Sequence, residues 1–116
     1  MDDFPVTFAS RVERPDGKTS PEELIASAHA TCYAMALSNT LAENGNAPER
    51  LTVDATCILH DQQLKITTIN LDVRGQVPGL SGEEFQENAR QAEQACPVSN
   101  ALRYNVEINV NANLES

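Results

Sequence analysis

The spacing of hydrophobic and polar residues changes several times along the chain, and each change predicts a different element. Residues 4–13 spread single apolar residues among small and polar ones, which favours an extended segment that ends at a turn over residues 15–17. A helix is predicted next, from Pro21 to Asn44, because Ser20 can cap its start and Gly45 can end it. Its apolar residues point in most directions, so we expect this helix to be central and buried.

Two strands are predicted after this helix. Apolar and polar residues alternate over residues 51–59, as in a half-buried strand, and a turn at residues 61–63 leads to a second strand over residues 64–74. The apolar residues of the second strand change face near Thr67 and Thr68. An extra residue in one strand has this effect, so the sequence predicts a β-bulge there.

The last third of the chain predicts two more helices and a strand. Ser81 and Glu84 form a capping box that starts a helix running to Ala95. Pro97 cannot continue that helix, so a short new helix is predicted to begin there with Cys96 at its cap. Alternation over residues 104–111 then gives a final strand with one face in water.

Size and charge narrow the class of protein. The 116 residues suffice for one domain with one core, which we place over residues 1–116. A net charge of −9 without a basic cluster disfavours nucleic acid and anionic membrane surfaces as partners. No stretch is apolar enough to span a membrane, and the acidic start of the chain is unlike a signal peptide. A cytoplasmic location is the default expectation.

The three cysteines occupy different predicted settings. Cys32 lies in the apolar helix, Cys96 lies at the break between two helices, and Cys57 lies on the apolar face of a strand. A thiol within a helix and a second thiol at a helix start form the layout of a two-cysteine redox centre, provided that the fold brings the two together. We interpret Cys57 as an ordinary core residue, because free cysteine behaves as a small hydrophobic side chain.

Four segments, in order along the chain, resemble the OsmC/Ohr family of organic hydroperoxide reductases. They are residues 19–25 (TSPEELI), 28–37 (AHATCYAMAL), 77–80 (VPGL) and 95–102 (ACPVSNAL). The resemblance extends from about Phe4 to the end of the chain. The residues before Cys32 and after Cys96 resemble the OsmC branch in particular.

The resemblance implies an α/β fold, in which a central buried helix and a second helix pack with an antiparallel sheet and two chains intertwine as a homodimer. It also implies a peroxidase that acts in oxidative or osmotic stress without a metal or other cofactor. Organic hydroperoxides are the implied substrates, with hydrogen peroxide as a second candidate. Family members usually carry about two further N-terminal strands, and we expect this chain to begin after them.

The same resemblance assigns roles to four residues. Cys32 is the nucleophile that peroxide oxidises, and Cys96 is the thiol that resolves the resulting sulfenic acid. A cysteine buried in mid-helix has its pKa raised and gains little from the helix dipole, so Cys32 requires a cation. Arg11 is the matching residue, with Arg14 as the competing candidate, and Glu22 would orient the arginine. An external dithiol, such as a lipoylated protein or another small thiol donor, would then reduce the disulfide.

Two other readings stay open. A non-catalytic stress or ligand-binding protein could keep the same fold with structural thiols, although the presence of both Cys32 and Cys96 argues against it. A cysteine hydrolase could pair Cys32 with His29, three residues earlier on the helix. That chemistry also needs an oxyanion hole and an orienting third group, and the sequence identifies neither. A structural role for a buried His29 is the commoner case.

No pair of Cys or His residues has the spacing of a zinc site.

Overall fold

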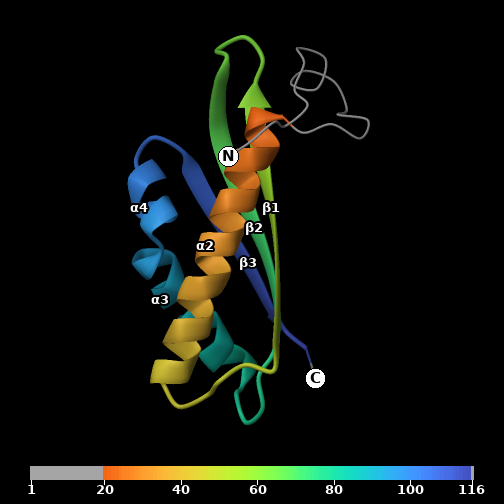
Figure 1. The fold of residues 1–116 in the computed structure, drawn as a ribbon, viewed down its shortest axis with the longest axis vertical. Helices are drawn as coiled ribbons and strands as arrows, with labels where there is room; N and C mark the ends of the chain where they lie inside the picture. The colour runs from red at the N-terminus through yellow and green to blue at the C-terminus, as the bar shows by residue number, and fades with distance from the viewer. Residues whose placement is uncertain (1–19, 116) are drawn as a thin grey trace, which may run out of the picture.

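A computed structural model describes residues 20–115 of the chain. The elements follow the order α2 (Pro21–Glu43), β1 (Arg50–His60), β2 (Lys65–Gln76), α3 (Gly82–Ala95), α4 (Pro97–Leu102) and β3 (Glu107–Leu114). All the helices lie on one face of the sheet, with α2 beside the α3–α4 pair (Figure 1). Within these residues, none of the helices has the length and apolar character needed to cross a membrane.

Within residues 20–115 the sheet has three strands in the order β1-β2-β3, and it is mixed rather than antiparallel. β1 and β2 form an antiparallel hairpin, whereas β2 and β3 run parallel. The predicted antiparallel sheet is therefore wrong for β3. The physical reason is the connection: α3 and α4 lie between β2 and β3 in the chain, and a crossover through helices allows the parallel pairing that a tight hairpin cannot make.

The predicted irregularity in the second strand is confirmed. Ile58 pairs with Thr68 and Leu59 pairs with Ile66, which leaves Thr67 as an extra residue in β2. The bulge lets the strand keep apolar residues on the helix-covered side both before and after it. The final strand starts later than the alternation predicted. Tyr104 belongs to the turn before β3, with φ at 70° and a side chain that is 99% exposed.

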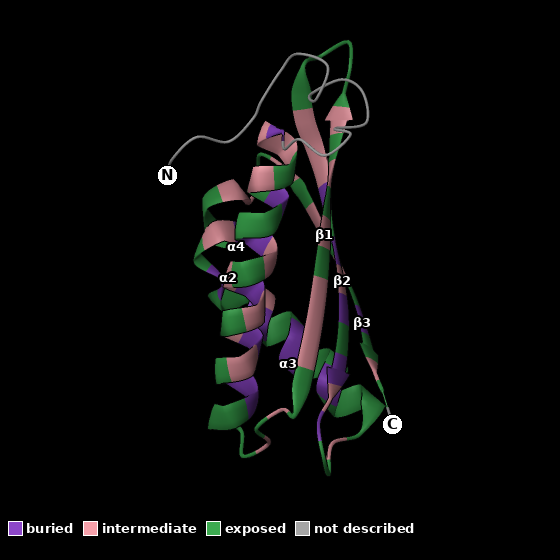
Figure 2. Cartoon of the chain, turned by 45° about the vertical axis from the view of Figure 1, so that its right-hand side comes forward, coloured by how far each residue is buried: buried purple, intermediate pink, exposed green. Residues whose placement is uncertain are grey.

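Helix α2 has the predicted boundaries but is not buried on all sides within this chain. Ser20 caps it, with its Oγ accepting the N–H of Glu23 at 3.2 Å, and Gly45 follows its end at a φ of 88°. The buried residues form one stripe toward the sheet and α3: Ala26, His29, Tyr33, Leu37, Thr40 and Leu41. The opposite side faces solvent, where Met35 is 70% exposed (Figure 2). In the described chain, other elements pack against only one side of this helix. This corrects the expectation of a fully buried helix.

Helix α3 positions the break at Cys96. Both bonds of its capping box are present, from the N–H of Glu84 to Ser81 Oγ and from the N–H of Ser81 to Glu84 Oε1. The ring of Phe85 is fully buried over β2, where a Cβ atom at Gly75 would lie 2.7 Å from the ring. A side chain at that position would force the ring to move, so the glycine permits the close approach of α3 to the sheet. This packing sets how close α3 lies to the sheet, and Pro97 sets where α3 ends.

Candidate active site

The fold brings two cysteines from distant parts of the sequence into contact. Cys32 lies in the middle of α2, Cys96 caps α4, and their sulfurs are 3.4 Å apart although 64 positions separate them in sequence. Cys96 is fully buried, whereas Cys32 is half-buried. Both are free thiols. A disulfide holds its sulfurs about 2.0 Å apart, so only a small movement of the two side chains would bring the sulfurs to bonding distance if an oxidant removed two electrons from the pair.

The sequence around Cys96 explains its place. Pro97 has no N–H to continue α3, and it suits the first position of a new helix. Cys96 therefore takes an extended conformation, with φ −84° and ψ 114°, between the two helices. Its sulfur accepts the backbone N–H of Ser99 at 3.5 Å, as the side chain of an N-cap residue does. The predicted cap at Cys96 is confirmed.

The surroundings of Cys32 favour the thiol over the thiolate. Burial raises the pKa of the Cys32 thiol, and the neighbouring Cys96 raises it further, while a backbone hydrogen bond from Val98 lowers it. The nucleophilic form of a cysteine is the thiolate, and a nearby positive charge is what would favour it at this position. Arg11 and Arg14, the two candidates from the sequence, lie outside the described residues.

Glu22 lies in the first turn of α2, as predicted, but far from Cys32 along the helix. The ten positions from Glu22 to Cys32 correspond to about 15 Å of helix, so Glu22 can act on Cys32 only through another group. Glu22 lines a small cavity of about 160 Å³ with Ala55 and Cys57. Burial and then the charge of Glu22 raise the pKa of the Cys57 thiol. Cys57 packs against the edge of the core, in keeping with a structural residue.

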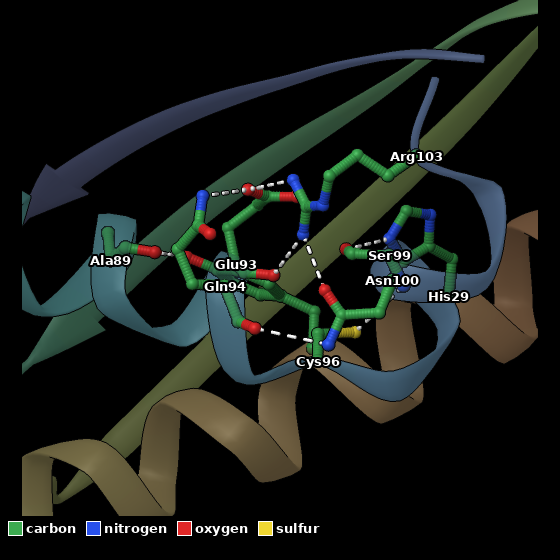
Figure 3. Close-up of polar contacts among 9 residues, drawn as sticks. His29, Ala89, Glu93, Gln94, Cys96, Ser99, Asn100 and Arg103 are labelled. Atoms are coloured by element: carbon green, nitrogen blue, oxygen red, sulfur yellow. Dashed lines mark hydrogen bonds and ion pairs between the residues drawn. The ribbon is translucent and has the colours of Figure 1, made fainter. Parts of the chain in front are cut away.

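His29 and Ser99 form a buried polar contact that the sequence did not reveal. Both side chains are fully buried, and His29 Nε2 lies 2.7 Å from Ser99 Oγ (Figure 3). Among the described residues no hydrogen bond joins His29 to Cys32, so the Cys–His pair of a hydrolase is not formed. Ser99 lies in the segment around Cys96 that the resemblance had already marked. Its partner on α2 became visible only in the folded chain.

A second polar cluster closes the joint between α3 and α4. Arg103 donates to the Glu93 carboxylate at 2.8 Å and to the Glu93 carbonyl oxygen at 3.1 Å. The same guanidinium donates to Asn100 Oδ1 at 2.7 Å, and Asn100 Nδ2 donates to the carbonyl oxygen of Gln94 at 3.1 Å (Figure 3). These bonds hold the two helices around Cys96 in a fixed relative orientation. No cluster of three metal-ligating side chains lies within residues 20–115.

Comparison with known proteins now decides the family. The family described as OsmC-like protein matches residues 14–111. This chain belongs to the OsmC-like family. The predicted resemblance is confirmed, and it extends over most of the sequence.

Individual relatives agree with this assignment. The chain is 39% identical to the protein named peroxiredoxin OsmC of Escherichia coli strain K12, over 97% of this chain and 78% of the relative. It is 30% identical to organic hydroperoxide resistance protein-like 1 of Staphylococcus epidermidis, over 85% of this chain and 73% of the relative. The crystal structure of an OsmC-like protein from Mycoplasma pneumoniae superposes with a TM-score of 0.77 at 22% identity, over 85% of this chain and 74% of that one. The fold is thus an α+β OsmC-like fold.

The buried histidine makes stability depend on pH. Burial lowers the pKa of His29 below its ordinary value of 6.5, and the nearby Glu93 offsets only part of this effect. The unfolded chain then binds a proton at His29 more readily than the folded chain does. We therefore expect the contribution of His29 to the free energy of unfolding to fall as the pH drops below about 6.5, and to level off below the pKa of the folded state.

Urea unfolding of the wild type and of His29→Gln between pH 8 and pH 5 checks this expectation. The difference in the free energy of unfolding between the two proteins should shrink as the pH falls, because glutamine does not titrate. A difference that stays constant over this range would show that burial does not lower the pKa of His29.

Proposed function

We propose that this OsmC-like protein is a cysteine-based peroxidase that reduces organic hydroperoxides to alcohols. The observation that carries the proposal is the 3.4 Å contact between the sulfurs of Cys32 and Cys96. The relatives named peroxiredoxin OsmC and organic hydroperoxide resistance protein-like 1 support the same activity and a role in oxidative stress defence. Hydrogen peroxide is a second candidate substrate.

The proposed cycle begins at the half-buried thiol, which is the more accessible of the two. The Cys32 thiolate attacks the outer oxygen of the hydroperoxide, the O–O bond breaks, and the alkoxide takes a proton to leave as an alcohol. Cys32 is then a sulfenic acid. The Cys96 thiol attacks that sulfur, an S–S bond forms, and the sulfenic oxygen leaves as water with the proton of the thiol. An external dithiol, for which a lipoylated protein is a candidate, reduces the disulfide and returns both thiols.

The charge that activates Cys32 is proposed to come from Arg11, with Glu22 orienting the guanidinium. The raised pKa of Cys32 supports the need for such a cation. The position of Glu22 supports an indirect role, because its carboxylate lies about three turns away from Cys32 along α2. Arg14 is the alternative source of the charge.

The cysteine variants test the roles of the two thiols. After one equivalent of cumene hydroperoxide, the wild type should contain a Cys32–Cys96 disulfide in non-reducing peptide mapping by mass spectrometry. Cys32→Ser should not consume peroxide, because the nucleophile is gone. Cys96→Ser should consume one equivalent and stop as a sulfenic acid that dimedone traps, because no second thiol lies within contact of Cys32.

Cys57→Ser is the matched control, since it removes the third thiol without touching the pair, and it should cycle as the wild type does with dihydrolipoamide. Two free thiols in the oxidised wild type would instead favour a non-catalytic protein of the same fold. Normal cycling by Cys96→Ser with the same reductant would exclude Cys96 as the resolving residue.

The arginine variants test the source of the charge. In a background that keeps only Cys32, Arg11→Ala should raise the pKa of this thiol by about 1 to 3 pH units, because a cation within a few ångströms stabilises a thiolate by that amount. The pH dependence of alkylation by iodoacetamide measures the pKa. Arg14→Ala in the same background is the control and should leave the pKa unchanged. A shift in Arg14→Ala alone would move the assignment to that residue.

The partner of this chain is proposed to be a second copy of itself. The exposed side of α2 supports a further covering layer, because it presents Met35 and a half-exposed Ile25 to solvent. Exposed apolar residues on a helix that is apolar on most sides are typical of a surface that becomes buried when two chains associate. The family resemblance implies the same homodimer.

Sedimentation equilibrium tests the dimer and the surface together. The wild type should sediment at twice the 12.6 kDa mass of the chain, and Met35→Glu should shift it toward the monomer, because a charge would be buried in the contact. Leu64→Glu, in the turn between β1 and β2, is the control for loss of an exposed apolar side chain and should remain a dimer. A monomeric wild type would contradict the proposal, and a dimeric Met35→Glu would move the contact elsewhere.

A further inference from the structure

Helix α4 is too short and too exposed to fix its own position. It spans only six residues, Pro97–Leu102, and a helix of that length is not stable by itself. Ser99 is the one fully buried residue that it contributes, while Val98 and Leu102 are half-buried. The placement of α4, and with it the placement of Cys96, must therefore depend on contacts with neighbouring elements.

Two sets of polar contacts meet this need, and they act on different neighbours. The Arg103–Glu93 ion pair ties the end of α4 back to α3. The hydrogen bond between Ser99 Oγ and His29 Nε2, at 2.7 Å, ties the start of α4 to α2, the helix that carries Cys32. It joins a side chain of α2 to a side chain of α4, and the backbone hydrogen bond from Val98 to the Cys32 side chain is a further contact between the two helices.

The same serine also contacts the resolving thiol. The backbone N–H of Ser99 donates to Cys96 Sγ at 3.5 Å, while its side chain bonds His29. His29 lies one helical turn before Cys32, on the buried stripe of α2. One residue of α4 thus connects Cys96 with the helix turn next to Cys32. The His29 Nδ1 atom is buried without a partner among the described residues, so the bond to Ser99 is the hydrogen bond that orients the ring within its packing.

We propose that the His29–Ser99 hydrogen bond is the device that holds Cys96 against Cys32 and thereby sets the rate at which the Cys32 sulfenic acid is resolved. His29 and Ser99 are positioning residues in this step, since neither touches the sulfenic oxygen. The inference rests on the proposed peroxidase cycle and concerns only its second step. There the S–S bond forms as the Cys32 S–O bond breaks and water leaves. Holding the two sulfurs in contact favours this step, because Cys96 then does not have to move into contact with Cys32 before it reacts.

The bond should matter for resolution and not for the attack on peroxide. Before oxidation Cys32 needs only its thiolate and access to substrate. After oxidation it needs the sulfur of Cys96 in contact. Loss of a single hydrogen bond of ordinary strength should slow resolution by about 3- to 10-fold. Slower resolution also leaves the sulfenic acid exposed for longer, so further oxidation to sulfinic acid should increase.

Ser99→Ala removes the bond, and Asn88→Ala is its matched control. Asn88 is also buried and also bridges α2, because its Oδ1 accepts from Asn44 Nδ2 at 2.8 Å, but it does so from α3 and without contact to α4. Single-turnover oxidation with cumene hydroperoxide gives the two rates: sulfenic acid by dimedone trapping in quenched samples, and disulfide by non-reducing mass spectrometry. In Ser99→Ala we expect an unchanged first rate and a 3- to 10-fold slower second rate. Asn88→Ala should keep both rates.

A pair of histidine variants makes the test independent of how Ser99→Ala folds. The amide of Gln reaches the position of the His Nε2 atom, whereas the amide of Asn reaches that of Nδ1. His29→Gln should therefore resolve at nearly the wild-type rate, and His29→Asn should resolve as slowly as Ser99→Ala. A merely structural role would lower the thermal stability of both variants without separating their resolution rates.

The outcomes separate this inference from the activity on which it rests. A slow second rate in Ser99→Ala and His29→Asn, with normal rates in His29→Gln and Asn88→Ala, supports it. Equal resolution rates in all variants overturn it and leave the peroxidase proposal standing. Equal slowing in Asn88→Ala also overturns it, because any loosening of the helices would then suffice. A wild type that forms no Cys32 sulfenic acid overturns the peroxidase proposal and this inference with it.

Discussion

The arrangement of this protein depends on the packing of a six-residue helix against the middle of a long one. Ser99 is the one fully buried residue of α4, and its apolar residues Val98 and Leu102 are only half-buried against the core. α4 nevertheless carries at its cap the thiol that must lie next to Cys32. A short helix gains its position from the elements around it, so the polar bonds of α4 add to the limited apolar burial that it has.

The core of the described chain includes Cys96, and Cys32 packs against that core. Phe85, Ala89 and Ala92 seat α3 in the core, and the close approach at Gly75 fixes how deeply it sits. Pro97 then ends that packing one residue after Cys96. The cysteine thus lies where a rigid helix stops and a weakly buried one begins. Because the sulfurs of Cys32 and Cys96 are 3.4 Å apart, the proposed disulfide would require only a short movement of the two side chains.

The same geometry favours a peroxidase over the alternative readings of the sequence. A hydrolase based on Cys32 would need His29 as its base, but the Nε2 atom of His29 is engaged by Ser99 within a buried site. A protein with purely structural thiols would have no need to place a half-buried sulfur in contact with a buried one. Burial raises the pKa of Cys32 and so disfavours the thiolate, which is why the proposed mechanism includes an arginine.

Sequence by itself determined the local structure of this protein with good accuracy. The caps at Ser20 and Ser81, the break at Pro97 and the bulge at Thr67 were all predictable, because each depends on residues close together in the chain. The pairing of Cys32 with Cys96 came from the family resemblance rather than from local chemistry. Arg11, which the sequence also suggested, lies outside the described residues.

Only the tertiary structure decided which distant residues meet. Nothing local indicates that β3 runs parallel to β2, because strand direction depends on how α3 and α4 cross the sheet. Nothing local pairs Ser99 with His29 either, since 70 positions separate them and the contact exists only when α4 packs on α2. The apolar pattern of α2 also did not determine how much of the helix is buried by neighbouring elements. Burial depends on which elements pack against a helix in the folded chain, whereas the sequence pattern indicates only which faces of the helix are apolar.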